Sequence, residues 1–133
     1  MEFCQFYPAV KKITINETTM KYTAVSGDCV SHLFFTHASF DPDNVSGERF
    51  DVDIPASILD LSQGDYNFTV INKTNYRLWV KLYQPQWTLD YYPTTLVSIR
   101  PATSVEFKMV RNPHNEKSYW LVLGEASREY DDE

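Results

Sequence analysis

Apolar and polar residues alternate along several short stretches of this chain, most clearly between residues 66 and 110. A period of two, in stretches rich in Val, Phe, Trp and Tyr, is typical of β-strands with one buried face. Three strands are predicted here, and the polar tetrad at 72–75 predicts a tight hairpin between the first two, because Asn bonds its own turn. The alternating apolar positions are Phe68, Val70, Leu78, Val80, Leu82, Val105, Phe107 and Met109.

The rest of the chain gives further short strands by the same criteria. Turn-forming residues separate them, and the second is expected to return along the first after a turn at 16–18. Convincing helical periodicity and internal repeats are both absent. Many short strands with almost no helix predict an all-β fold, a β-sandwich. These additional strands are expected at residues 8–15, 20–25, 29–35, 50–54, 87–92, 96–99 and 118–123.

One stretch resembles a known family. Residues 71–81 read Ile-Asn-Lys-Thr-Asn-Tyr-Arg-Leu-Trp-Val-Lys, and Pro85, Pro93 and Pro101 follow. This spacing is similar to the core of major sperm protein (MSP) domains, as found in the sperm protein itself and in VAP proteins. Residues 54–61 resemble the opening of the same domain, so the likeness covers residues 50–127. The resemblance implies an immunoglobulin-like sandwich of the MSP kind.

The 133 residues are expected to form one domain overall. Residues 50–127 would be the MSP-like sandwich, and residues 128–133 an acidic, frayed tail. Residues 1–49 form an N-terminal extension without a counterpart in the family. Ile13, Leu33 and Phe35 make this extension too apolar to remain solvated, so it is expected to add strands to the body or cover a sheet edge.

Charge and composition exclude several classes of partner. The net charge is −6, which disfavours nucleic acid and anionic membranes, since both reward clustered Lys and Arg. No stretch approaches the roughly 20 apolar residues of a membrane span, so no direct membrane insertion is expected. The N-terminus lacks the basic and apolar regions of a signal peptide. We therefore expect a cytoplasmic protein with Cys4 and Cys29 as reduced thiols.

Four asparagines disagree with a cytoplasmic location. Asn16, Asn44, Asn67 and Asn72 each begin an Asn-X-Ser/Thr sequon. One interpretation is glycosylation in a secretory lumen; the other is chance in a β-rich chain with many Thr and Asn residues. Without an expected signal peptide, chance is the preferred interpretation, and the place of Asn67 inside a strand pattern agrees with it.

The sequence contains no recognisable catalytic motif. Its four glycines are not clustered, which excludes phosphate-binding and dinucleotide-binding loops. Cys29, His32 and His37 form a loose set that could bind zinc, but a fourth ligand is missing and two histidines five apart on a strand would face opposite sides. A part-buried strand with surface histidines is the preferred interpretation. We expect no enzyme activity, no metal and no cofactor.

A partner-binding site is expected in the proline-flanked segment 84–94. Trp87, Tyr91 and Tyr92 are the residue types that dominate interface hot spots, and Pro85 holds the segment extended. In VAP-like members the same region binds acidic-flanked peptides through a basic groove. Of that groove only Lys81, at the end of the core strand, is kept. The resemblance therefore implies apolar rather than electrostatic recognition here.

Two hypotheses for the function follow. The first is a non-enzymatic protein–protein interaction module of the MSP type, acting as an adaptor or as a self-assembling structural protein of the cytoskeleton. Its partner would be a protein or peptide, or a second copy of the chain. The alternative is a glycosylated extracellular immunoglobulin-like ectodomain, which the sequons favour.

Overall fold

The computed structural model describes residues 7–38, 40–41, 43, 48–55, 67–82, 88–89, 96–111 and 118–129. Within these ranges the helical part is the single turn η1 (Ser26–Asp28), and no helix there has the length and hydropathy needed to cross a membrane. The strands are β1 (Tyr7–Thr14), β2 (Lys21–Thr23), β3 (Val30–Thr36), β4 (Arg49–Ile54), β5 (Asn67–Lys73), β6 (Arg77–Leu82), β7 (Thr88–Leu89), β8 (Leu96–Ile99), β9 (Thr103–Arg111), β10 (Ser118–Gly124) and β11 (Ala126–Glu129).

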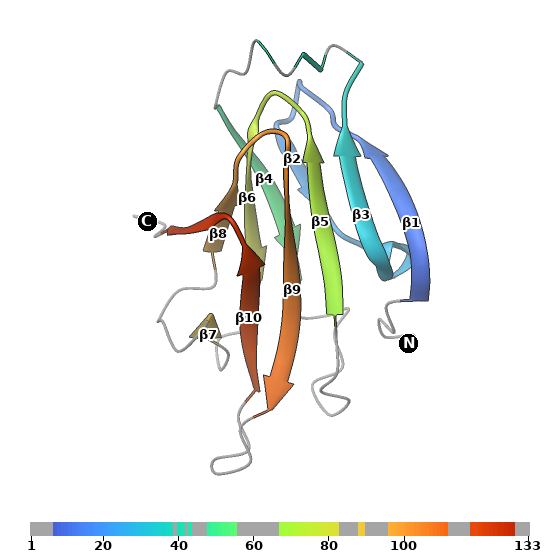
Figure 1. Cartoon of the computed structure of the whole chain (residues 1–133). Helices are drawn as coiled ribbons and strands as arrows, with labels where there is room; N and C mark the ends of the chain where they lie inside the picture. The colour runs from blue at the N-terminus through green and yellow to red at the C-terminus, as the bar shows by residue number, and fades with distance from the viewer. Residues whose placement is uncertain are drawn as a thin grey trace.

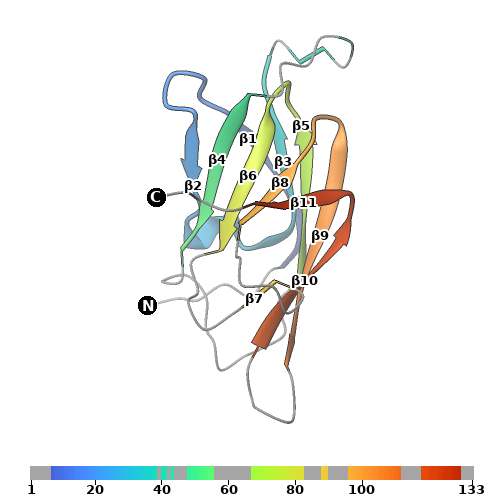
Figure 2. The same ribbon diagram turned by 90° about the vertical axis from the view of Figure 1, so that its left-hand side faces the viewer.

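The strands form two sheets packed face to face, which confirms the predicted all-β sandwich. The front sheet, nearer the viewer in Figure 1, has the strand order β1-β3-β5-β9-β10-β7, and the back sheet has the order β11-β8-β6-β4-β2. Figure 2 shows the two layers from the side. The expected N-terminal β-extension is also confirmed, because β1 and β3 complete one end of the front sheet and β2 forms an edge of the back sheet.

The first six strands alternate between the two sheets. Each connection carries the chain across the sandwich, so β3 runs parallel to β1 and β5, and β4 runs parallel to β2 and β6. Four pairs are antiparallel. In the front sheet β9 pairs with β5 and with β10, and in the back sheet β8 pairs with β6 and with β11. Immunoglobulin sandwiches are built from antiparallel sheets, and the parallel pairs of this chain differ from that arrangement. The alternation of apolar and polar residues does not reveal the difference, because it is the same in parallel and antiparallel strands.

This alternation corrects two pairings expected from the sequence. The tetrad at 72–75 is not a hairpin, because β5 lies in the front sheet and β6 in the back sheet. Likewise β2 does not return along β1; it pairs with β4, Lys21 beside Asp51 and Thr23 beside Asp53. In both cases the second strand lies in the opposite sheet, so its apolar side chains, such as the partly buried Tyr22 of β2, pack against the same core as those of the first.

The turn between β5 and β6 is organised by one buried amide, that of Asn72, which is 0% exposed. Its Nδ2 donates to the carbonyl oxygens of Tyr76 (2.8 Å) and Ile99 (2.9 Å). Its Oδ1 accepts from the backbone N–H (3.0 Å) and the hydroxyl (2.7 Å) of Thr74. The backbone oxygen of Asn72 accepts from the N–H of Ala102 at 2.8 Å. Every hydrogen-bonding position of this amide is filled, and the bonds join β5 to Tyr76, directly before β6, and to β8.

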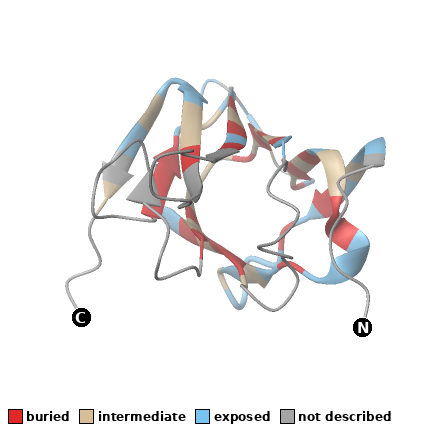
Figure 3. Cartoon of the chain, turned by 90° about the horizontal axis from the view of Figure 1, so that it is seen from below, coloured by how far each residue is buried: buried red, intermediate tan, exposed pale blue. Residues whose placement is uncertain are grey.

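The core is the apolar layer between the two sheets, and the strands carry the buried residues that Figure 3 colours red. Phe68 stacks on Phe107 with ring centroids 5.1 Å apart, and Trp120 meets Phe68 edge-on at 5.5 Å. Residues of the N-terminal extension belong to the same cluster. Its members include Ile13, Ile15, Leu33, Phe35, Phe50, Val52, Phe68, Val70, Leu78, Val80, Phe107 and Trp120.

The free edge of β1 is interrupted by a bulge. The register to β3 shifts between Tyr7 and Val10. The hydroxyl of Ser31 accepts from the N–H of Ala9 (3.1 Å) and donates to its carbonyl (3.0 Å), so the bulged backbone keeps both partners. Bulges and charged side chains on edge strands hinder pairing with another chain, and Lys12 is exposed on this strand.

Two residues of the acidic tail expected at 128–133 belong to a strand instead. Arg128 and Glu129 belong to β11, which pairs antiparallel with β8; residues 130–133 lie outside the described ranges. The chain reaches β11 from β10 through Gly124, whose φ of +132° few side chains adopt. A Cβ at this position would lie 3.0 Å from the carbonyl oxygen of Ser104.

We predict that Gly124→Ala lowers the free energy of unfolding by more than about 1 kcal/mol, because alanine is strained at this φ and its Cβ meets backbone that cannot yield. Gly27→Ala is the matched control, since a Cβ there meets nothing within 4 Å. That change should stay within about 0.5 kcal/mol. Urea unfolding of both variants measures the difference, and equal stabilities would contradict the assignment of strain to Gly124.

Candidate interaction site

The outer side of the back sheet carries a compact set of charged and aromatic side chains. Along β6 the buried residues Leu78, Val80 and Leu82 alternate with half-buried ones that point outward. In β4, Arg49 and Asp51 alternate with the buried residues Phe50 and Val52, and the register places Arg49, Asp51 and Asp53 beside Arg77, Trp79 and Lys81. We call this surface the Trp79 face; it comprises Arg49, Asp51, Asp53, Arg77, Trp79 and Lys81.

The centre of the Trp79 face is a cation–π pair. The guanidinium carbon of Arg49 lies 4.1 Å from the ring centroid of Trp79, and Arg49 Nε donates to Asp51 Oδ1 at 2.6 Å. Asp51 pairs in register with Trp79. A planar guanidinium held on an indole by a neighbouring carboxylate loses little freedom when a partner contacts it.

Lys81 lies at the other end of the same face. It is half-buried, next to Asp53 on β4 and Leu96 on β8. Asp53 is buried and forms an ion pair with Lys21, whose Nζ lies 3.0 Å from Asp53 Oδ2. The charges of this end therefore alternate in sign across β2, β4 and β6, with the carboxylate of Asp53 between Lys21 and Lys81.

Of the partner-binding residues expected from the sequence, the structure places Lys81 alone. Pro85, Trp87, Tyr91 and Tyr92 lie outside the described residues, as does most of the strand expected at 87–92. Within that stretch, Thr88 and Leu89 form β7, which pairs with Tyr119 and Trp120 of β10. The binding segment at 84–94 therefore stays a prediction.

Sequence reasoning did not assign Arg49 and Trp79 to a site. The alternation in residues 78–82 does put Trp79 on the face opposite Leu78 and Val80, so the signal for its outward position was present. Trp120 alternates with apolar neighbours in the same way, yet it is fully buried. The pairing of Arg49 with Trp79 depends on the parallel register of β4 and β6, which no local pattern indicates.

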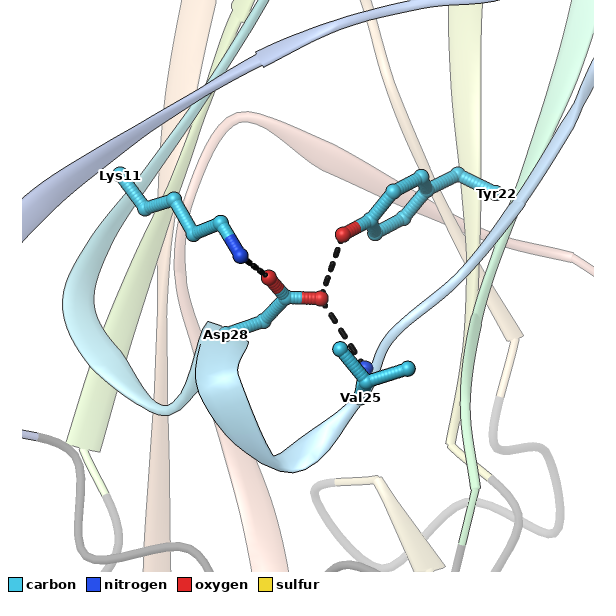
Figure 4. Close-up of polar contacts among 4 residues, drawn as sticks. All are labelled: Lys11, Tyr22, Val25 and Asp28. Carbon is cyan, nitrogen blue, oxygen red and sulfur yellow. Dashed lines mark hydrogen bonds and ion pairs between the residues drawn. The ribbon is translucent and has the colours of Figure 1, made fainter.

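A second polar cluster surrounds Asp28, which is 2% exposed (Figure 4). Its carboxylate accepts from Lys11 Nζ, from the hydroxyl of Tyr22 and from the backbone N–H of Val25 (3.0 Å). These donors come from β1, from β2 and from the start of η1. The cluster therefore ties the N-terminal strands together, and its carboxylate is already occupied by three donors.

Two tyrosines have altered acidity. Burial, together with the hydrogen bond to Asp28, raises the pKa of Tyr22 well above its ordinary value of 10.0. The hydrogen bond that Tyr76 donates to Glu17 (2.6 Å) raises the pKa of Tyr76 to about 12. Both phenols are therefore neutral donors at physiological pH, and neither is poised to act as a base.

The structure differs from the sequence prediction at Cys29, which was expected to be a reduced thiol. Cys29 is buried and disulfide-bonded, so the prediction of a reduced thiol is wrong at this position; Cys4 lies outside the described residues. The alternative of a zinc site fails as well, because the Cys29 sulfur is oxidised. His32 is exposed beside the Ser31 hydroxyl, His37 packs its ring 5.5 Å from Tyr76, and the described ranges hold no group of three possible ligands.

One shallow polar hollow of about 250 Å³ lies where β8 meets β11, lined by Ser98, Arg100, Gly124, Glu125, Ala126 and Ser127. The hydroxyl of Ser98 donates to Glu129 (2.8 Å) and accepts from Arg77 (3.3 Å). Arg100 and Glu125 are exposed and 4.0 Å apart.

No protein-family model, curated protein or solved structure matches this chain. The resemblance to MSP domains thus rests on the residues quoted above and stays a prediction.

The Asp28 cluster predicts a specific dependence of stability on alkaline pH. Because the pKa of Tyr22 is higher in the folded chain than in the unfolded one, its bond to Asp28 stabilises the fold fully below pH 10.0 and less as the pH rises further. The free energy of unfolding of the wild type should therefore fall more steeply above this pH than that of Tyr22→Phe. Denaturant unfolding between neutral and alkaline pH tests this, and parallel curves would refute it.

Proposed function

We propose that the protein is a non-enzymatic interaction module that binds a protein partner through the Trp79 face of its back sheet. The observation that carries this proposal is the Arg49–Trp79 pair, with the ring and guanidinium 4.1 Å apart on the outer side of two central strands. Trp and Arg are the residue types that contribute most to binding energy at protein interfaces.

The surroundings of the pair suit this role. Strands β4 and β6 are held on both sides, by β2 and by β8, so the backbone under the face is rigid. The ion pairs of Arg49 with Asp51 and of Lys21 with Asp53 hold the charged side chains in place. A surface that is already ordered loses less entropy on binding. The mixture of paired charges around one aromatic ring favours a protein over nucleic acid or an anionic membrane.

The segment expected to bind from the sequence follows this face directly along the chain. Lys81 belongs to the Trp79 face, and β6 ends at Leu82, two residues after Val80. We include Pro85, Trp87, Tyr91 and Tyr92 in the proposed surface on the sequence argument alone. Membership of the MSP family, an adaptor or cytoskeletal role and self-association are versions of the same proposal, supported by the resemblance at 71–81.

The compartment is the point at which the two hypotheses differ. The first hypothesis places the module in the cytoplasm, where thiols stay reduced. The disulfide bond at Cys29 favours the alternative, an extracellular sandwich domain, since disulfides form and persist in oxidising compartments. The proposal of a binding face on the back sheet applies equally to both.

The test compares Trp79→Ala with the wild type. Partners retained by the immobilised full-length chain from an extract of its source tissue are identified by mass spectrometry, and the affinity of the purified partner is then measured. We expect Trp79→Ala to weaken binding by about 2 kcal/mol, roughly 30-fold. Unfolding of the variant is followed in parallel so that affinity is expressed per folded molecule.

Phe34→Ala is the matched control. Phe34 is also a half-buried aromatic, but it lies on β3, beside Ile71, in the front sheet. The Phe34→Ala variant should bind the partner with an affinity within about twofold of the wild type, which is a change of less than about 0.5 kcal/mol in binding free energy. If Phe34→Ala weakens binding and Trp79→Ala does not, the binding face is on the other sheet and the proposal is wrong.

A further inference from the structure

Three of the four sequons lie in the described part of the chain, and the structure separates them sharply. Asn16 and Asn67 are exposed, whereas Asn72 is 0% exposed. Asn44 lies outside the described residues. The structure therefore distinguishes sequons that can carry a sugar in the folded protein from one that cannot.

Asn16 lies in the turn between β1 and β2, at the upper end of the sandwich in Figure 1. Its backbone oxygen accepts from the N–H of Met20 at 3.0 Å, and its Oδ1 accepts from the N–H of Thr18 at 2.9 Å. These bonds hold the turn through oxygen atoms. The nitrogen Nδ2, where a glycan would be attached, donates no hydrogen bond within the described ranges.

Asn67 is the first residue of β5, at the opposite end of the front sheet. Its side chain alternates with that of the buried Phe68, so it points away from the core, and its neighbour on β9 is the exposed Lys108. A strand position was a reason to doubt this sequon from the sequence. The outward direction and the place at the strand end remove that objection.

Asn72 is the internal control. Both hydrogens of its Nδ2 are donated inside the sandwich, to Tyr76 and to Ile99. A sugar on this nitrogen would remove at least one of these bonds and could not fit, because the side chain touches no solvent. Any chain modified here cannot close the turn between β5 and β6, so folded molecules should carry none.

The disulfide bond at Cys29 is the independent observation that supports modification. A bonded cysteine is expected in the secretory pathway and outside the cell, and it is rare in the cytosol. The same pathway attaches N-linked glycans to sequons. One oxidised cysteine and two exposed sequons thus point to the same compartment.

We propose that the protein carries N-linked glycans on Asn16 and Asn67 and none on Asn72. The donor is a lipid-linked oligosaccharide diphosphate. Asn Nδ2 forms a bond to the anomeric carbon of the first sugar, and the bond between that carbon and the diphosphate oxygen breaks. The lipid diphosphate leaves with the electron pair, and the amide gives up one proton to a base of the transferase. Both glycans lie away from the Trp79 face, on the turn end and on the front sheet.

The test uses full-length folded protein from its native source. Peptide N-glycosidase treatment in heavy-oxygen water converts each glycosylated asparagine to labelled aspartate, and peptide mass spectrometry locates the label. We expect label at Asn16 and Asn67 and none at Asn72. Absence of label at either exposed site contradicts the proposal for that site. Label at Asn72 in folded protein overturns the structural argument.

Variants made in the cell type that produces the protein give a second readout. Thr18→Ala destroys the first sequon but leaves Asn16 and its turn in place, and it should increase gel mobility by one glycan. Thr18→Ser keeps the sequon and should migrate like the wild type. Thr69→Ala and Thr69→Ser form the equivalent pair for Asn67. Unchanged mobility of both alanine variants, with the Cys29 disulfide intact, would refute the proposal without any doubt about folding.

Discussion

The architecture depends on the buried amide of Asn72. A chain that crosses between two sheets carries its backbone through the edge of the core, and buried N–H and C=O groups without partners are costly. Asn72 supplies partners at this crossing: two donated bonds to the carbonyls of Tyr76 and Ile99 and two accepted bonds from Thr74. Through them the front sheet at β5 is fastened to the back sheet at β6 and β8. Apolar burial provides most of the stabilisation, but this network determines where the crossing occurs.

The position of the crossing determines the surface. With β6 beginning at Arg77, its odd-numbered residues point outward and its even-numbered ones inward. A shift of one residue would exchange the two sets and put Trp79 in the core and Val80 in solvent. The parallel register of β4 with β6 then brings Arg49 to the ring of Trp79. The Trp79 face is therefore a consequence of the Asn72 turn, and the exposed sequon asparagines lie on other parts of the molecule.

Much of the strand content could be predicted from the sequence, because period-two alternation is local. Residues 50–54, 96–99 and 118–123 form strands β4, β8 and β10 with bounds within one residue of the prediction. Pairing could not be predicted in the same way. The tetrad at 72–75 has the composition of a hairpin, and only burial of Asn72 against Ile99, distant in sequence, shows that it crosses between sheets. The site shows the same division: the outward position of Trp79 is a local property, whereas its partner Arg49 is brought to it by strand pairing. The state of Cys29 was mispredicted because it was inferred from compartment instead of from geometry.

The most direct test of this account is the unfolding free energy of Asn72→Asp beside that of Asn75→Asp. Aspartate at 72 keeps the acceptors for Thr74 but removes both donors and adds a buried charge, so stability should fall by about 3 kcal/mol or more. Asn75 is half-buried and accepts from the N–H of Asp41 at 3.0 Å through its oxygen. A carboxylate also makes this bond, so the Asn75 variant should lose clearly less stability than Asn72→Asp. Equal and small effects of the two substitutions would show that the crossing does not depend on the Asn72 amide.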